Sequence, residues 1–299
     1  MKNSIKWMKN KIKKLFSKEN KIFSQLDKND RLVEDTLKKL ETIKEEKKEG
    51  EVAVFVPKYS TYIKLENYEE EPYREIKGIV FPLGKSYLII LNEKELNHTE
   101  LSKLILAHEL FGHVDFRKRI GKKLEPFFKL IKIVEKDEEN HLLKELYYYY
   151  QIIFEGLGEA YANLMEMSMG LFNSLKKRDR SAKIVAERFI QLALTYLPYE
   201  ETYEEVIKKG IEEVIKMQIE GKEKEAFWLL SNLIYMTGTI FLFKIDKIKG
   251  GHIANSLTNY AEKKQFSYNE IKELILKLWE YKKEMEKKID KYLEIFITS

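Results

Sequence analysis

Two histidines and a glutamate lie together in one apolar stretch of this chain. His108 is followed at once by Glu109, and His113 comes five residues after His108. The chain has 5 histidines in all, so two in one segment indicate a shared role. Imidazoles that hold a metal ion, beside a carboxylate that takes a proton from water, are the components of a zinc hydrolase. We expect His108 and His113 to bind zinc (Zn²⁺) and Glu109 to act as the catalytic base.

The five-residue spacing of the histidines requires a distorted helix. On an ideal helix of 3.6 residues per turn, side chains five residues apart diverge by about 140°, and those four apart by about 40°. A π-bulge, whose i→i+5 hydrogen bonds widen one turn, lets the two imidazoles converge. Gly112 precedes His113, where it lowers the cost of a distorted backbone. The alternative is a buried helix whose histidines are satisfied by hydrogen bonds.

A catalytic zinc site needs a third protein ligand, and a later segment supplies two candidates. Glu155 and Glu159 are four residues apart and share one face of a helix, among apolar and small residues. Gly156 and Gly158 each weaken a helix by about 1 kcal/mol, which suggests close approach of another helix or a ligand. We expect Glu155 to bind the metal and Glu159 to accept a hydrogen bond from a histidine N–H. The alternative is a pair of surface glutamates.

These motifs resemble those of the gluzincin metallopeptidases. The histidine spacing is similar to the HExxxH variant of the microtubule-associated tyrosine carboxypeptidases and their uncharacterised prokaryotic relatives, and the segment that begins at Glu155 is similar to the one that supplies their third ligand. The resemblance covers residues 86–167 specifically. It implies a gluzincin-like domain, a zinc cofactor and a peptidase of peptide or protein substrates, more specifically a carboxypeptidase. We do not locate the arginine-rich substrate segment of the tubulin-directed enzymes, so their specificity does not carry over.

The predicted fold class is α+β and mostly helical, with a small β-sheet beside the HExxxH helix and a helical C-terminal half. Asn97 should cap the HExxxH helix, and Ser267 with Glu270 forms a capping box for the last helix. β-Branched and aromatic residues predict strands at residues 52–56, 59–65, 78–81 and 87–91. Helical patterns cover residues 20–48, 101–113, 141–170, 181–197, 201–219, 223–246 and 267–296. We expect three parts: an N-terminal helical extension (1–48), the zinc-binding catalytic region (49–175) and a helical subdomain that completes the cleft (176–299).

Composition sets the class of protein. With 299 residues, 44% of them hydrophobic, the chain can bury a sizeable core. The absence of cysteine excludes disulfides and thiolate metal sites, and fits a reducing compartment, so we expect a cytoplasmic protein. The net charge of +5 arises from 54 basic and 49 acidic residues, and no nucleic-acid-binding motif accompanies it. The oligomeric state is not determined by the sequence.

The first 18 residues differ from the rest in charge. They contain seven lysines and no acid, with an apolar stripe at helical spacing formed by Ile5, Met8, Ile12, Leu15 and Phe16. No segment of the chain reaches the roughly 18 consecutive apolar residues that span a bilayer. We expect this helix to dock on its own domain. The alternative is a weak contact with an anionic membrane surface.

Further residues could take part in a reaction. His252, which follows two glycines, could stabilise an oxyanion or bind substrate, and Tyr161 and Tyr260 could donate hydrogen bonds to a tetrahedral intermediate. The cations that could pair with a substrate carboxylate are Arg117, Arg119, Arg188 and Lys249. Two other classes stay open: a metal-binding interaction or membrane-surface protein without peptidase activity, and a carboxylate-bridged metal site using Glu109 and His113.

Overall fold

The structure of the chain is a computed structural model. It describes residues 2–45, 53–67, 77–97, 99–120, 140–263 and 266–298. Within these ranges, the side chains of residues 2–16, 97, 99, 260–263 and 292–298 are not described. Two expected features, the cap formed by Asn97 and the functional side chain of Tyr260, therefore lie outside the described residues.

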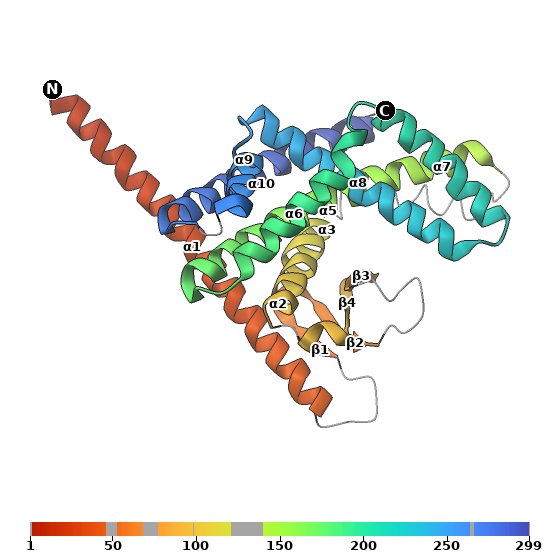
Figure 1. Ribbon diagram of the computed structural model, residues 1–299, viewed down its shortest axis with the longest axis horizontal. Helices are drawn as coiled ribbons and strands as arrows, with labels where there is room; N and C mark the ends of the chain where they lie inside the picture. Colours follow the sequence, from red (N-terminus) through yellow and green to blue (C-terminus); the bar gives the residue numbers. More distant parts are fainter. Residues whose placement is uncertain are drawn as a thin grey trace.

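The fold is α+β and mostly helical, as predicted, with one small mixed sheet (Figure 1). The strands are β1 (Val54–Val56), β2 (Thr61–Glu66), β3 (Gly78–Leu83) and β4 (Ser86–Asn92), close to the four expected segments. The helices are α1 (Lys2–Glu45), α2 (Thr99–Ala107), η4 (His108–Val114), α3 (Asp115–Ile120), α5 (His141–Lys177), α6 (Ser181–Tyr196), α7 (Tyr203–Ile219), α8 (Glu223–Ile248), α9 (His252–Lys263) and α10 (Tyr268–Thr298). The predicted capping box is confirmed: Ser267 N–H donates to Glu270 Oε2, and Glu270 N–H donates to Ser267 Oγ.

The sheet places β3 at an edge, beside the helix that carries the histidines. The strand order is β1-β2-β4-β3, with β2 and β4 parallel and both outer pairs antiparallel. Asn92 N–H donates to Lys77 O, and hydrogen-bonded pairs alternate along antiparallel strands. The main-chain groups of Gly78 and Val80 therefore face away from β4. These main-chain groups are therefore not used in pairing with β4, and Val80 O accepts a hydrogen bond from Arg117 instead.

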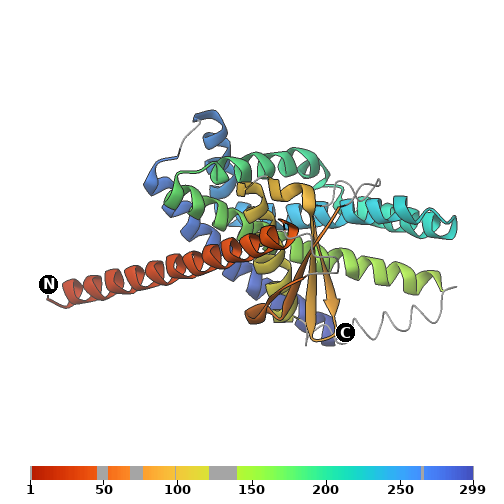
Figure 2. The same cartoon turned by 90° about the horizontal axis from the view of Figure 1, so that it is seen from below.

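Helix α5 lies at the centre of the molecule, where α2, α6, α8 and α10 pack around it (Figures 1 and 2). One large apolar core takes residues from all three expected parts of the chain, from Ile22 on α1 to Ile289 on α10. A smaller apolar cluster joins the start of α5 to α7 and α8. By length and composition, α8 is the one described helix that could cross a membrane, but 44% of its most apolar window is buried inside the fold.

Helix α1 docks through its second half. Its apolar stripe from Ile22 to Leu40 is buried, and Glu34 accepts hydrogen bonds from Lys103 of α2 and Lys177 of α5. Lys18 forms an ion pair with Glu280 of α10. The earlier turns run away from the other elements in both views (Figures 1 and 2). Because the side chains of residues 2–16 are not described, the choice between docking and a membrane contact stays a prediction.

Candidate metal centre

The two histidines lie on a π-helical segment, as predicted. Residues His108–Val114 form π-helix between α2 and α3. That Gly112 lowers the cost of the distorted backbone stays a prediction, and its φ is not in the left-handed region. A Cβ atom at this position would lie 2.4 Å from the Cβ of Ala162 on α5. Gly112 is thus required by the close approach of α5, which brings the glutamates toward the histidines.

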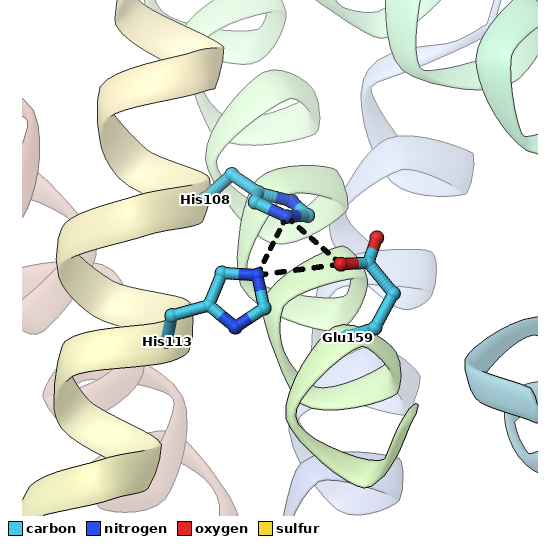
Figure 3. Close-up of side chains that lie close together, drawn as sticks. All are labelled: His108, His113 and Glu159. Atoms are coloured by element: carbon cyan, nitrogen blue, oxygen red, sulfur yellow. Dashed lines mark hydrogen bonds and ion pairs between the residues drawn. The ribbon is translucent and has the colours of Figure 1, made fainter. Parts of the chain in front are cut away.

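His108, His113 and Glu159 form a compact group of ligand atoms (Figure 3). The two Nε2 atoms are 3.2 Å apart, and Glu159 Oε2 lies 3.5 Å from that of His108 and 3.3 Å from that of His113. A tetrahedral ion with bonds of about 2.0–2.1 Å has its ligand atoms about 3.3 Å apart. The donor set and its spacing therefore fit one small metal ion, and His108 and Glu159 are buried around it.

The structure corrects the expected roles of the two glutamates. Glu159, and not Glu155, joins the histidines. Glu155 lies one turn earlier on α5, where both of its oxygens accept hydrogen bonds of 2.9 Å from Arg117 Nη2. Both carboxylates lie on the same face of α5, so their spacing alone does not distinguish them. The axial position of α5 against η4 selects Glu159.

The role expected for Glu159, accepting a histidine N–H, belongs to Glu166. The Nδ1 atom of His108 lies 2.9 Å from Glu166 Oε2, and Arg188 Nη1 donates to both Glu166 oxygens at 2.9 and 2.8 Å. Arg188 is therefore committed to Glu166 and does not stand ready for a substrate carboxylate. This arrangement orients His108 with Nε2 toward the ligand group.

The electrostatics of the centre favour a cation. Burial by itself lowers the pKa of His108, but the Glu159 and Glu166 carboxylates outweigh it and raise the pKa to about 10. Burial opposes ionisation of Glu159 in the same way, yet His108 and His113 hold its pKa well below the usual value. A metal ion would therefore compete with a proton for the same position.

Glu109, the expected base, lies beside the ligands in the wall of a cleft. It is buried, and it lines the cleft together with His108, His113 and Glu159. Gly78 of β3 packs directly on it: a Cβ atom there would lie 2.9 Å from Glu109 Oε1. The strand edge therefore fixes the carboxylate, and any larger residue at position 78 would displace it.

The cleft has three walls. Two of them are α5 and α8, and the third combines η4 with the β3 edge and Arg117 of α3, whose Nη1 donates to Val80 O at 3.0 Å. The residues that line it are Gly78, Ile79, Val80, His108, Glu109, His113, Arg117, Gln151, Glu155, Glu159, Phe227, Trp228, Ser231, Ile234 and Tyr235. It is thus an open site with both polar and aromatic surfaces.

The other expected residues lie elsewhere, and several cleft residues, Tyr235 among them, were missed. Tyr161 is fully buried and donates its hydroxyl to Asp115 Oδ2 at 2.9 Å, so it does not face the cleft. His252 is exposed at the start of α9, after two glycines of positive φ, and does not line the cleft. Tyr235 does line it. The sequence signal was the spacing of Trp228, Ser231 and Tyr235 on one face of α8.

Comparisons with protein-family models, with curated proteins and with solved structures find no match for this chain. The resemblance to the gluzincins therefore stays a prediction from the motifs, and so does the cytoplasmic location.

Proposed function

We propose that the protein is a zinc-dependent metallopeptidase. The observation that carries the proposal is the group of ligand atoms on His108, His113 and Glu159, 3.2–3.5 Å apart, in a cleft wall beside the buried Glu109. Structural zinc sites are closed by four protein ligands, whereas catalytic sites use three and leave a position for water or substrate. Three ligands among the described residues, in an open cleft, favour catalysis over a structural role.

In the proposed hydrolysis, each residue of the cleft has a separate role. Zinc, when bound, supplies Lewis acidity that lowers the pKa of water and polarises a carbonyl. Glu109 accepts the proton of the attacking water and delivers it to the leaving amine. Tyr235 donates its hydroxyl to the oxyanion that develops at the carbonyl. Desolvation in the cleft, with the Glu159 and Glu109 carboxylates nearby, raises the pKa of Tyr235, which is 38% exposed, so this donor keeps its proton.

The β3 edge supports a peptide as the substrate. The main-chain groups of Gly78 face away from β4, next to Glu109, and an extended peptide could add to this edge as a further strand. The carbonyl of Val80 already accepts a hydrogen bond from Arg117, and Pro82 has no N–H that could donate to a peptide. Strand addition would therefore be short and centred on Gly78, close to the metal ligands.

Cleavage at the C-terminus is proposed from the motif resemblance. Arg117 is the only arginine or lysine among the described cleft residues, and its guanidinium is paired with Glu155 and Val80. It is therefore not assigned as the receptor of a terminal carboxylate. Matched peptides with a free acid or an amide at the C-terminus test this part: release of the last residue from the acid alone supports a carboxypeptidase, and internal cleavage of both contradicts it.

The test of the proposal combines elemental analysis with a peptide assay. The purified chain should contain about one zinc and cleave peptides, and removal of zinc by a chelator should abolish cleavage reversibly. Zinc bound at this stoichiometry without cleavage of any peptide in a broad library would contradict the peptidase. It would favour the alternative, a metal-binding interaction or membrane-surface protein.

A further inference from the structure

Gln151 has an unusual environment for a residue of this cleft. Its side-chain carbonyl oxygen is enclosed and has no hydrogen-bond partner, which holds for no other cleft residue that the structure describes. A buried acceptor without a partner destabilises a fold, because it has lost its hydrogen bonds to water and gained none in return. Three other described side chains, those of Asn173, Ser181 and Thr239, also hold such an atom, and none of the three lines the cleft. A role of this oxygen in ligand binding would explain why position 151 holds a glutamine and not an apolar residue.

The position of Gln151 gives the distance over which it would act. Gln151, Glu155 and Glu159 follow one another at four-residue spacing along α5. Eight residues of helix span about 12 Å, so Gln151 lies about 12 Å along α5 from the metal ligand. The α8 wall has a similar length, since Phe227 and Tyr235 are also eight residues apart. The cleft is therefore an elongated groove with metal ligands at one end and Gln151 at the other.

We propose that Gln151 recognises the main chain of a peptide substrate and accepts a hydrogen bond from an N–H about three residues from the scissile bond. An extended peptide advances about 3.3 Å per residue, so 12 Å corresponds to three or four residues. The terminal torsion of glutamine is soft, which lets its oxygen turn into the groove when a donor arrives. The inference rests on the proposed peptidase activity and deepens it, because it makes the substrate an oligopeptide or an unfolded segment. For a carboxypeptidase, the contact falls on the N-terminal side of the scissile bond.

The inference is tested by N-methylation of the substrate backbone. In a series of peptides of one sequence, each main-chain N–H near the scissile bond is replaced in turn by N-methyl. The zinc-loaded protein and its Gln151→Leu variant are assayed with each peptide. A buried hydrogen bond contributes about 0.5–1.5 kcal/mol, so wild type should lose about three- to tenfold in kcat/KM at one position about three residues away. The same methylation should have no effect on Gln151→Leu.

Controls separate recognition from folding. Gln151→Leu removes an unpaired buried acceptor, so its melting temperature should be unchanged or higher. Gln191→Leu, an exposed change on α6, should respond to every methylation as wild type does. Equal responses of wild type and Gln151→Leu at all positions would overturn the inference and leave the peptidase intact. No cleavage of any unmethylated peptide by the zinc-loaded wild type would overturn both.

Discussion

The inner end of the cleft, at the metal ligands, and its middle, at the Arg117–Glu155 pair, differ in how their charges are held. At the inner end, His108 and Glu166 are buried, and Glu166 in turn is fixed by Arg188. In the middle, the Glu155 carboxylate that pairs with Arg117 is 34% exposed, against 3% for Glu166, whereas the two arginines are similarly exposed. Buried and mutually paired groups keep one geometry, whereas a pair that water reaches can exchange partners. The comparison teaches that the buried inner end keeps a geometry that could hold a metal ion, whereas water reaches the carboxylate of the middle pair.

The largest effect should separate the two glutamates of α5. Glu159→Ala should lose the zinc of the wild-type chain, because it removes one of three ligands. Glu155→Ala should keep that zinc, because Glu155 pairs with Arg117 instead. Elemental analysis of both variants measures this, and a chelator should lower the melting temperature of wild type and of Glu155→Ala only. Zinc lost from Glu155→Ala and kept by Glu159→Ala would reverse the ligand assignment.

The next effect concerns the base at the inner end. Glu109→Gln should retain zinc but lose about 10²–10⁴-fold in kcat, since the amide does not accept the proton of water. Gly78→Ala should also keep zinc and lose activity, because the added methyl meets the Glu109 carboxylate. Activity and bound zinc are measured on the same samples. Full activity in Glu109→Gln would remove this residue from the mechanism.

A smaller effect on zinc affinity is expected for Glu166, which contacts the ligand His108 and is not itself a ligand. Glu166→Gln should weaken zinc binding by about 10–100-fold, because a neutral amide orients and polarises His108 less well than a carboxylate. Competition with a chromogenic chelator measures the affinity. Glu187→Gln, an exposed position on α6, serves as the control. Unchanged affinity in Glu166→Gln would mean that the ligand geometry is fixed by packing alone.

The smallest effect should come from a half-exposed charge cluster away from the cleft. Hydrogen bonds from Lys103 and Lys177 lower the pKa of Glu34 from its usual 4.5 to about 2. A lowered pKa stabilises the fold above about pH 4.5, and this contribution is lost as the pH falls toward 2. Glu34→Gln should therefore destabilise the protein by about 1 kcal/mol at pH 7, after allowance for solvent screening, and not at pH 2.

Denaturant unfolding at several pH values measures this difference, with the exposed Glu41→Gln as the control on the same helix. A destabilisation that did not change between pH 7 and pH 2 would mean that packing, and not charge, holds α1 at this point.

The local features of the protein could be predicted from sequence because their causes are local. The five-residue spacing of His108 and His113 allows convergence only on a widened turn, and η4 is π-helical. The strands followed from β-branched runs, and the last helix from its capping box. Glycines in α5 indicated close contacts, and a Cβ at Gly156 would lie 2.4 Å from the Thr237 side chain on α8.

Which of the two glutamates joins the histidines was decided only by the tertiary structure. Glu155 and Glu159 share one face of α5, so a helix shifted by one turn would present the other carboxylate to the histidines. The contacts of Gly112 with Ala162, and of Gly238 with Glu159, fix the axial position of α5 against its neighbours. The sequence by itself determined which residue types could hold a metal. Packing between helices distant in sequence determined which of these side chains meet. Helical spacing sets the direction in which a side chain points, but it does not set the axial position of its helix against a neighbouring helix.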